Sequence, residues 1–201
     1  VCNMYTFIKK NLLLIGVVAC LYPLQVSAQD KLSVHAKADF VSDYVWRGAD
    51  QQSGCSVQPS LTLGYAGFSL NVWGSQSLTK WEEGGAKEWD INLGYTYRNL
   101  TVTLSDYWWS GINQPYGHYK NSHYFEGTLA YCFGDSFPLS LSWSTMFAGA
   151  DKNEKGNLQA STYLSASCPF RLPADILLTP AVGFTPWKGM YHRKAAFTDL
   201  S

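Results

Sequence analysis

The chain has few charged residues and few cysteines, and beyond its first part it has no long apolar run. Charged residues make up 15% of its 201 residues, whereas a soluble domain usually carries about a quarter. The 15 basic and 15 acidic residues balance to a formal net charge of zero, so the composition does not indicate a nucleic-acid partner. Aromatic residues, in contrast, reach 15%.

The cysteines exclude a dense disulfide framework. Two of the five, Cys2 and Cys20, lie in the leader described next, which leaves Cys55, Cys132 and Cys168. An odd number at wide spacing does not predict paired bridges. No His or Cys ligand spacing predicts a metal site, and no nucleophile motif predicts a catalytic one. We therefore expect no metal, no cofactor and no enzymatic activity.

The first residues predict an export signal. Lys9 and Lys10 precede an apolar run over residues 12–19, and residues 26–28 read Val-Ser-Ala, a small-x-small cleavage pattern. The run is too short for a transmembrane helix, which needs about 20 apolar residues. We predict that residues 1–28 are a cleaved signal peptide.

A lipoprotein signal that ends at Cys20 is the alternative, although the residues after Cys20 stay apolar where a lipid tether is normally polar. No later apolar run is long enough to cross a membrane as a helix. The exported protein is therefore soluble, lipid-tethered or a barrel.

Short alternating segments fill the rest of the chain, and their connections are long and short in turn. The segment 34–46, for example, places Val, Ala, Phe, Tyr and Trp on one face and mostly charged residues on the other. Long connections are expected over residues 47–55, 78–87, 110–122, 150–157 and 187–195, and short turns at residues 66–67, 98–99, 134–138 and 169–174. This rhythm is typical of a transmembrane β-barrel, with tight turns at one rim and long loops at the other.

We therefore predict an all-β fold, an antiparallel up-and-down transmembrane β-barrel over residues 29–201. Nine strands and the start of a tenth are visible in the sequence, and bacterial barrels have even strand numbers. The barrel is expected to have at least ten strands, about twelve at full length, and the chain is expected to be truncated at its C-terminus.

Six charged residues on the polar phase of these strands are candidate lumen-lining, selectivity-setting residues: Lys37, Asp39, Asp43, Arg47, Asp90 and Glu126. Rings of charge set selectivity in wet pores. The same charges can instead pair across a filled interior, because only large barrels leave an assured open channel. The sequence leaves both interpretations open.

Aromatic residues gather where strands meet connections. At the long-loop rim these include Tyr44, Trp46, Trp89, Trp109 and Tyr124. Such belts are typical of proteins that cross a bilayer. We therefore expect both rims to lie at membrane interfaces.

The histidines of the longest connection are candidate catalytic groups. His118 and His123 flank it, with Ser105, Asp106 and Ser122 nearby in sequence. No elbow motif surrounds either serine, so we interpret the pair as exposed loop histidines.

The segment that follows the first strand resembles a known family. Ser42, Tyr44, Trp46, Arg47 and Gly48 follow the pattern Ser-x-Tyr-x-aromatic-Arg-Gly, which resembles the opening hairpin of the TorF-family porins. The similarity is clearest over residues 38–97. The resemblance implies an outer-membrane barrel with a pore function.

Our leading hypothesis is a small Gram-negative outer-membrane porin that lets small solutes diffuse, with membrane lipid and those solutes as its partners. One alternative is a closed barrel whose surface loops bind a ligand or partner, and another is a barrel enzyme that acts on lipid. A soluble or lipid-tethered periplasmic β-protein is the third alternative. The pattern carries no information on the oligomeric state.

Overall fold

The computed structural model describes residues 31–79, 87–110, 115–134 and 136–201. The chain separates into two units, Val1–Lys31 and Leu32–Ser201, and the second unit holds all the described strands. The predicted signal peptide, residues 1–28, lies outside the described residues.

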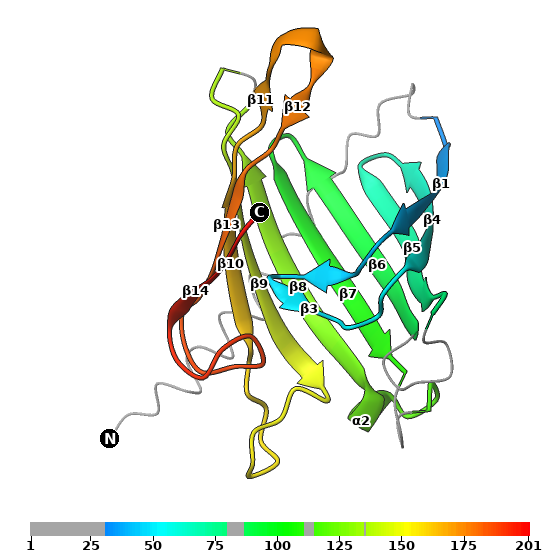
Figure 1. The fold of residues 1–201 in the computed structure, drawn as a ribbon, viewed down its shortest axis with the longest axis vertical. Coiled ribbons are helices and arrows are strands. Elements are labelled where there is room, and N and C mark those ends of the chain that lie inside the picture. The colour runs from blue at the N-terminus through cyan, green and yellow to red at the C-terminus, as the bar shows by residue number, and fades with distance from the viewer. Residues whose placement is uncertain (1–30, 80–86, 111–114, 135) are drawn as a thin grey trace, which may run out of the picture. The chain divides into compact units, whose positions relative to one another are not determined.

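The second unit is built on one ten-stranded antiparallel sheet (Figure 1). Its strands lie side by side in the order in which they occur along the chain. They are β1 (Ser33–Val41), β4 (Ser56–Tyr65), β5 (Phe68–Ser77), β6 (Lys87–Tyr97), β7 (Leu100–Trp109), β8 (His123–Cys132), β9 (Ser140–Gly149), β10 (Thr162–Ser167), β13 (Ala181–Thr185) and β14 (Ala196–Leu200). The fold is therefore all-β, as the alternating sequence predicted.

Two hairpins and short helical turns complete the described part of the chain. β2 (Val45–Trp46) pairs with β3 (Ala49–Asp50), and β11 (Phe170–Arg171) pairs with β12 (Leu177–Leu178). A single α-helical turn, α2, spans Tyr119–Ser122, and a 3-10 turn, η1, spans Pro173–Asp175. Among the described residues, no helix is long and apolar enough to cross a membrane.

The tight turns lie where the sequence predicted them. Ala66 and Gly67 join β4 to β5 with φ angles of 50° and 84°, and two consecutive positive φ angles suit the right-handed twist of a hairpin. Arg98 and Asn99 join β6 to β7, with Arg98 at φ 54°. These turns hold the register in which one set of side chains faces each side of the sheet.

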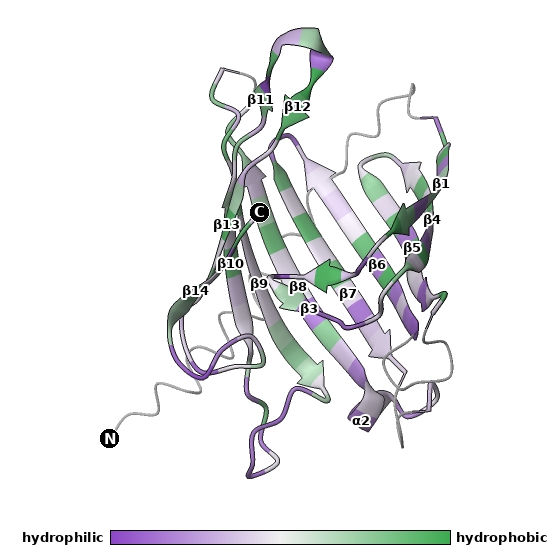
Figure 2. Cartoon of the chain, viewed as in Figure 1, coloured by the Kyte–Doolittle hydropathy of each residue, from purple (hydrophilic) through white to green (hydrophobic). Residues whose placement is uncertain are grey.

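The outer face of the sheet is apolar. Leu93, Leu104 and Leu129 are about half exposed there, at 50%, 51% and 50%. Bands of hydrophobic residues recur on neighbouring strands in the hydropathy view (Figure 2). The outer face therefore presents broad apolar surface that the rest of the described chain leaves uncovered.

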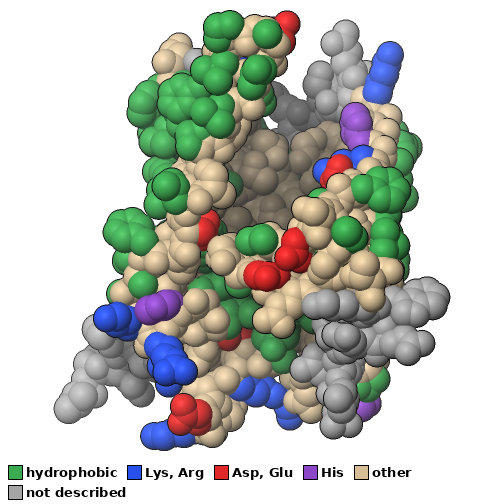
Figure 3. All heavy atoms as spheres, viewed as in Figure 1, with side chains coloured by type: hydrophobic (Ala, Val, Ile, Leu, Met, Phe, Trp, Pro, Cys, Tyr) green, Lys and Arg blue, Asp and Glu red, His purple; other side chains and the backbone are tan. Residues whose placement is uncertain are grey.

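The inner face of the sheet is polar and carries the buried groups. Asn71 Nδ2 donates to Ser60 Oγ at 2.9 Å, and Asn92 Nδ2 donates to Asn71 Oδ1 at 3.1 Å, which ties β4, β5 and β6 together. The buried apolar side chains of the described residues, Tyr107, Met146 and Tyr163, lie on this same phase. The packed interior therefore lies on the concave side of the sheet, which is hollowed in Figure 3.

Two boundaries differ from the sequence prediction. The first strand ends at Val41 rather than at residue 46, because the chain bends there into the β2–β3 hairpin. The connection over residues 169–174 is the longer β11–β12 hairpin instead of a short turn. β13 begins directly after Pro180, in keeping with the missing backbone donor of proline.

The sheet is open in the described residues. β1 and β14 are its two edges, and no ladder joins them. The predicted barrel is therefore not closed within the described residues.

Candidate functional site

A short hairpin folds from the edge of the sheet into its concave side. This inner hairpin, Val45–Asp50, consists of β2, β3 and the turn Arg47-Gly48, where φ is 50° and 77°. Gly48 lies against β14, since a Cβ atom built on it would be 2.7 Å from Asp199 Cβ and 2.9 Å from Thr198 O. Only glycine combines this close approach with the left-handed φ at low cost.

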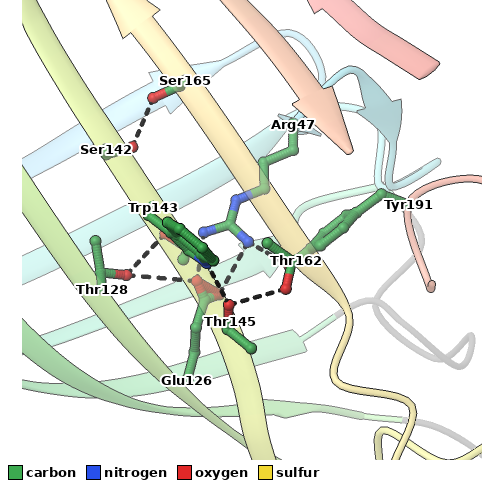
Figure 4. Close-up of polar contacts among 10 residues, drawn as sticks. Arg47, Glu126, Thr128, Ser142, Trp143, Thr145, Thr162, Ser165 and Tyr191 are labelled. Carbon is green, nitrogen blue, oxygen red and sulfur yellow. Dashed lines mark hydrogen bonds and ion pairs between the residues drawn. The ribbon is translucent and has the colours of Figure 1, made fainter. Parts of the chain in front are cut away.

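Arg47 anchors the inner hairpin to the opposite part of the sheet. Its Nη1 donates to Glu126 Oε2 at 2.9 Å and its Nη2 donates to Glu126 Oε1 at 2.7 Å. This two-point geometry is the strongest form of a carboxylate pair. The Glu126 side chain, on β8, is fully buried, and the Arg47 side chain is 13% exposed. Figure 4 shows the pair and its polar surroundings.

Aromatic rings enclose the same guanidinium. The Cζ atom of Arg47 lies 4.6 Å from the ring centroids of both Trp46 and Tyr163 and 5.1 Å from that of Tyr191. Arg47 Nη1 also donates to the hydroxyl of Tyr191. Such faces stabilise a largely desolvated cation, so the site holds a mostly buried positive charge.

The electrostatics of the loop residues agree with this geometry. Burial alone would lower the pKa of Arg47, but its hydrogen bonds to Glu126 outweigh that effect and raise the pKa above its ordinary value. Burial raises the pKa of Tyr191, despite the opposing charge of Arg47. The guanidinium therefore stays charged and the phenol stays neutral across the physiological range.

The rings extend into an aromatic cluster on the inner face. Trp46 lies 5.8 Å from Tyr107, 5.5 Å from Trp109 and 5.6 Å from Tyr191, measured between ring centroids. Beside the inner hairpin is a cavity of about 520 Å³, whose walls include Trp46, Arg47, Trp109, Tyr191 and Phe197. The interior is thus lined by polar and aromatic side chains, and the inner hairpin narrows it.

Two carboxylates lie near Tyr44, the residue just before the inner hairpin. Its ring packs against Trp73 of β5 at 5.5 Å. Burial raises the pKa of Tyr44, and the nearby carboxylates Glu88 and Asp90 of β6 raise it further. Both carboxylates are themselves buried, with exposures of 2% and 7%.

The structure brings some of the predicted lumen residues together and separates others. Arg47 and Glu126 form the central pair described above. Lys37 and Asp39 pair with each other on β1 at 2.8 Å, largely exposed. Asp43 accepts hydrogen bonds from the backbone N–H groups of Tyr44, at 2.9 Å, and Gly54, at 3.2 Å.

Asp90, the remaining predicted lumen residue, lies beside Glu88 rather than beside a cation. Of the residues that carried the family resemblance, Tyr44, Trp46, Arg47 and Gly48 all contribute to the site, while Ser42 is exposed at the bend. That motif therefore marks the segment that enters the interior.

Sequence reasoning missed several members of the site. Glu88 shares the strand phase of Asp90, a signal that could have identified it. Tyr163 donates to Asp199 Oδ2 at 3.0 Å, and Tyr191 contacts Arg47. Neither tyrosine was distinguishable in the sequence from the many other aromatic residues.

The interpretation of His123 as an exposed loop histidine was wrong. Its exposure is 1%; Nδ1 lies 2.7 Å from Asp106 Oδ1, and the ring stacks on Tyr119 at 4.1 Å. The pair lies on the outer phase of β7 and β8. It is buried there because α2 folds back over that face. His118, in contrast, is exposed as expected.

The Asp106–His123 pair does not engage the neighbouring serine. Ser122 Oγ donates to the carbonyl oxygens of Pro115 and His118, at 2.9 and 2.8 Å. His123 Nε2 lies 2.5 Å from the Tyr116 carbonyl. In this arrangement the pair holds the 115–122 loop against the sheet.

Within the part of the chain that the structure describes, no group of three or more His, Cys, Asp or Glu side chains could hold a metal ion. The described cysteines, Cys55, Cys132 and Cys168, are free.

Comparison with protein families gives a match over most of the chain. Residues 25–201 match a family described as "Bacterial protein of unknown function (Gcw_chp)". Searches among curated proteins and among solved structures gave no match.

Proposed function

The chain belongs to the Gcw_chp family of bacterial proteins of unknown function, and we propose that it forms an outer-membrane β-barrel whose polar interior passes small solutes. The observation that carries the proposal is the reversal of the usual faces: apolar residues are outside and polar residues are inside. Soluble proteins rarely expose one continuous apolar patch of more than a few hundred Å². In a bilayer this apolar outer face would contact lipid instead of water, which removes the free-energy cost of its exposure.

In a bilayer the sheet would also have to close into a barrel. The outer edges of β1 and β14 would leave backbone N–H and C=O groups unpaired in hydrocarbon, where each unsatisfied group costs several kcal/mol. The proposal therefore includes the joining of these edges into a barrel, after export through the predicted signal peptide. The resemblance to the TorF-family porins favours the same assignment.

The inner hairpin gives the proposed pore its narrowest part. It crosses from the β1 side of the sheet, reaches Glu126 on β8 and lies against β14. A polar passage with one fixed obstruction would select solutes by size and charge. The aromatic walls around Arg47 favour small polar solutes with a flat or ring-shaped face.

A closed barrel is the second candidate, and the Arg47–Glu126 pair favours it. A bidentate, desolvated pair between opposite parts of the interior fills space that an open channel would leave to water. Such a barrel would act through its long loops, which would bind a ligand or partner. A barrel enzyme acting on lipid remains a weaker alternative.

Planar-bilayer recording on the purified full chain tests the proposal. Wild-type protein should give discrete conductance steps, and replacing Val45–Asp50 by a short Gly-Ser turn should enlarge them. Shortening the loop over residues 152–156, far from Glu126 in the sequence, is the matched control and should leave the steps unchanged.

Two results would contradict the proposed pore or the proposed membrane location. If neither wild type nor the hairpin variant conducts, although both insert and fold, the closed barrel replaces the pore. If alkaline carbonate extracts the protein from outer-membrane fractions, the membrane assignment itself fails.

A further inference from the structure

Two buried carboxylates on β6 have no cation among the described residues. Glu88 and Asp90 lie two positions apart on the inner face, with exposures of 2% and 7%. The two inner cations described above are already engaged, Arg47 by Glu126 and Lys37 by Asp39. The pair is therefore without a compensating cation among the described residues.

One oxygen atom of each carboxylate is also unsatisfied. Glu88 Oε2 and Asp90 Oδ1 have no hydrogen-bond partner among the described residues. Buried polar atoms normally have partners, and an unpaired buried carboxylate is among the costliest groups a fold can contain. Two of them side by side add mutual repulsion. A bound cation or a shared proton between them would relieve this repulsion.

The surroundings are those of a cation site for hard ions. Tyr44 and Trp109 interact with Glu88, so the Tyr44 hydroxyl is a third oxygen beside the pair. The donor set is entirely oxygen, without a thiolate or imidazole, and such donors suit Ca²⁺ and Mg²⁺. Ca²⁺ accepts irregular geometry and completes its shell with water.

We propose that Glu88 and Asp90, beside Tyr44, form a binding site for a hydrated divalent cation of the Ca²⁺ class on the inner face. The two carboxylates ligate the ion, and water supplies the remaining ligands. The site does not depend on whether the interior conducts, so it extends beyond the proposed function.

Luminescence of Tb³⁺, a stand-in for Ca²⁺, tests the site on the full chain folded in detergent. Tyr44, Trp73 and Trp109 lie close enough to the carboxylates to sensitise the bound ion. Excitation of the aromatic residues should give saturable Tb³⁺ emission that excess Ca²⁺ removes. The double variant Glu88→Gln/Asp90→Asn should lower the affinity at least tenfold. Asp39→Asn, which changes a carboxylate already paired with Lys37, is the control and should leave it unchanged.

Thermal unfolding separates the site from a folding defect. Ca²⁺ at millimolar concentration should raise the melting temperature of wild type and leave that of the double variant unchanged, because only a ligand of the folded state stabilises it. In EDTA the double variant should melt at or above the wild-type temperature, since the repulsion is gone.

The opposite results overturn the proposal. Emission that the double variant retains would place the ion elsewhere. A wild-type melting temperature that is independent of Ca²⁺, together with a more stable Glu88→Gln variant, would show that the carboxylates share a proton instead. Protein that binds Tb³⁺ but does not conduct would contradict the pore and leave the cation site standing.

Discussion

Replacing Arg47 by alanine removes the cation that compensates a fully buried carboxylate. The side chain of Glu126 has 0% exposure, and both of its oxygens accept from Arg47. Removing one partner of a buried pair typically costs about 3–5 kcal/mol, because the remaining charge stays buried. Loss of the contacts with three aromatic rings adds to the cost, though not additively.

We therefore expect Arg47→Ala to lower the free energy of unfolding by about 4 kcal/mol, roughly a thousandfold in the folding equilibrium. Urea titration of the protein folded in lipid vesicles, followed by Trp fluorescence, measures this change. Lys37→Ala is the matched control. It breaks an exposed ion pair, with side-chain exposures of 65% and 47%, and should cost no more than about 1 kcal/mol.

The double variant Arg47→Ala/Glu126→Ala isolates the pair. It should be less destabilised than the sum of its single variants, by at least about 1.5 kcal/mol, because the second change removes the orphaned charge. An Arg47→Ala variant within about 0.5 kcal/mol of wild type, like the Lys37 control, would refute the reasoning. It would mean that Glu126 gains water as soon as the inner hairpin is released.

Three further predictions concern the faces, the turn and the rims. Leu93→Arg, on the outer face, should cost about 2–4 kcal/mol in vesicles, and Asn92→Arg, on the inner face, far less; equal costs in the urea titration would contradict the two-faced sheet. Gly48→Ala should lower the melting temperature measured by circular dichroism, because its left-handed φ and close contact with β14 exclude a side chain; an unchanged melting temperature would argue against that contact. An epitope tag in the loop over residues 152–156 should bind antibody on intact cells, while a tag at Arg98 should not; the reverse labelling would invert the proposed topology.

The strands and their faces could be predicted from the sequence because a strand has a period of two. The alternation that placed Leu93 outside and Asn92 inside depends only on local backbone geometry. The tight turns at residues 66–67 and 98–99 were predictable because they, too, depend on a few neighbouring residues. The end of the first strand was not, since residues 42–46 continue the alternation after the chain has already turned.

The aromatic residues show the limit of pattern reasoning. Trp89 is 49% exposed on the outer face, as a belt residue should be. Tyr44, Trp46, Trp109 and Tyr124, predicted for the same rim, instead lie on the inner side, where they pack against other rings. A ring suits either environment, so its position along a strand does not decide which one it enters.

The sequence by itself determined an all-β chain with two chemically distinct faces, because hydrophobic periodicity and turn residues act over a few positions. It also marked Arg47 and Glu126 as charges on the polar phase. Only the tertiary structure decided that these two residues, 79 positions apart, meet in a bidentate pair. That pairing depends on the curvature of the whole sheet and on the contacts of the inner hairpin with β8 and β14, which are distant from it in the chain.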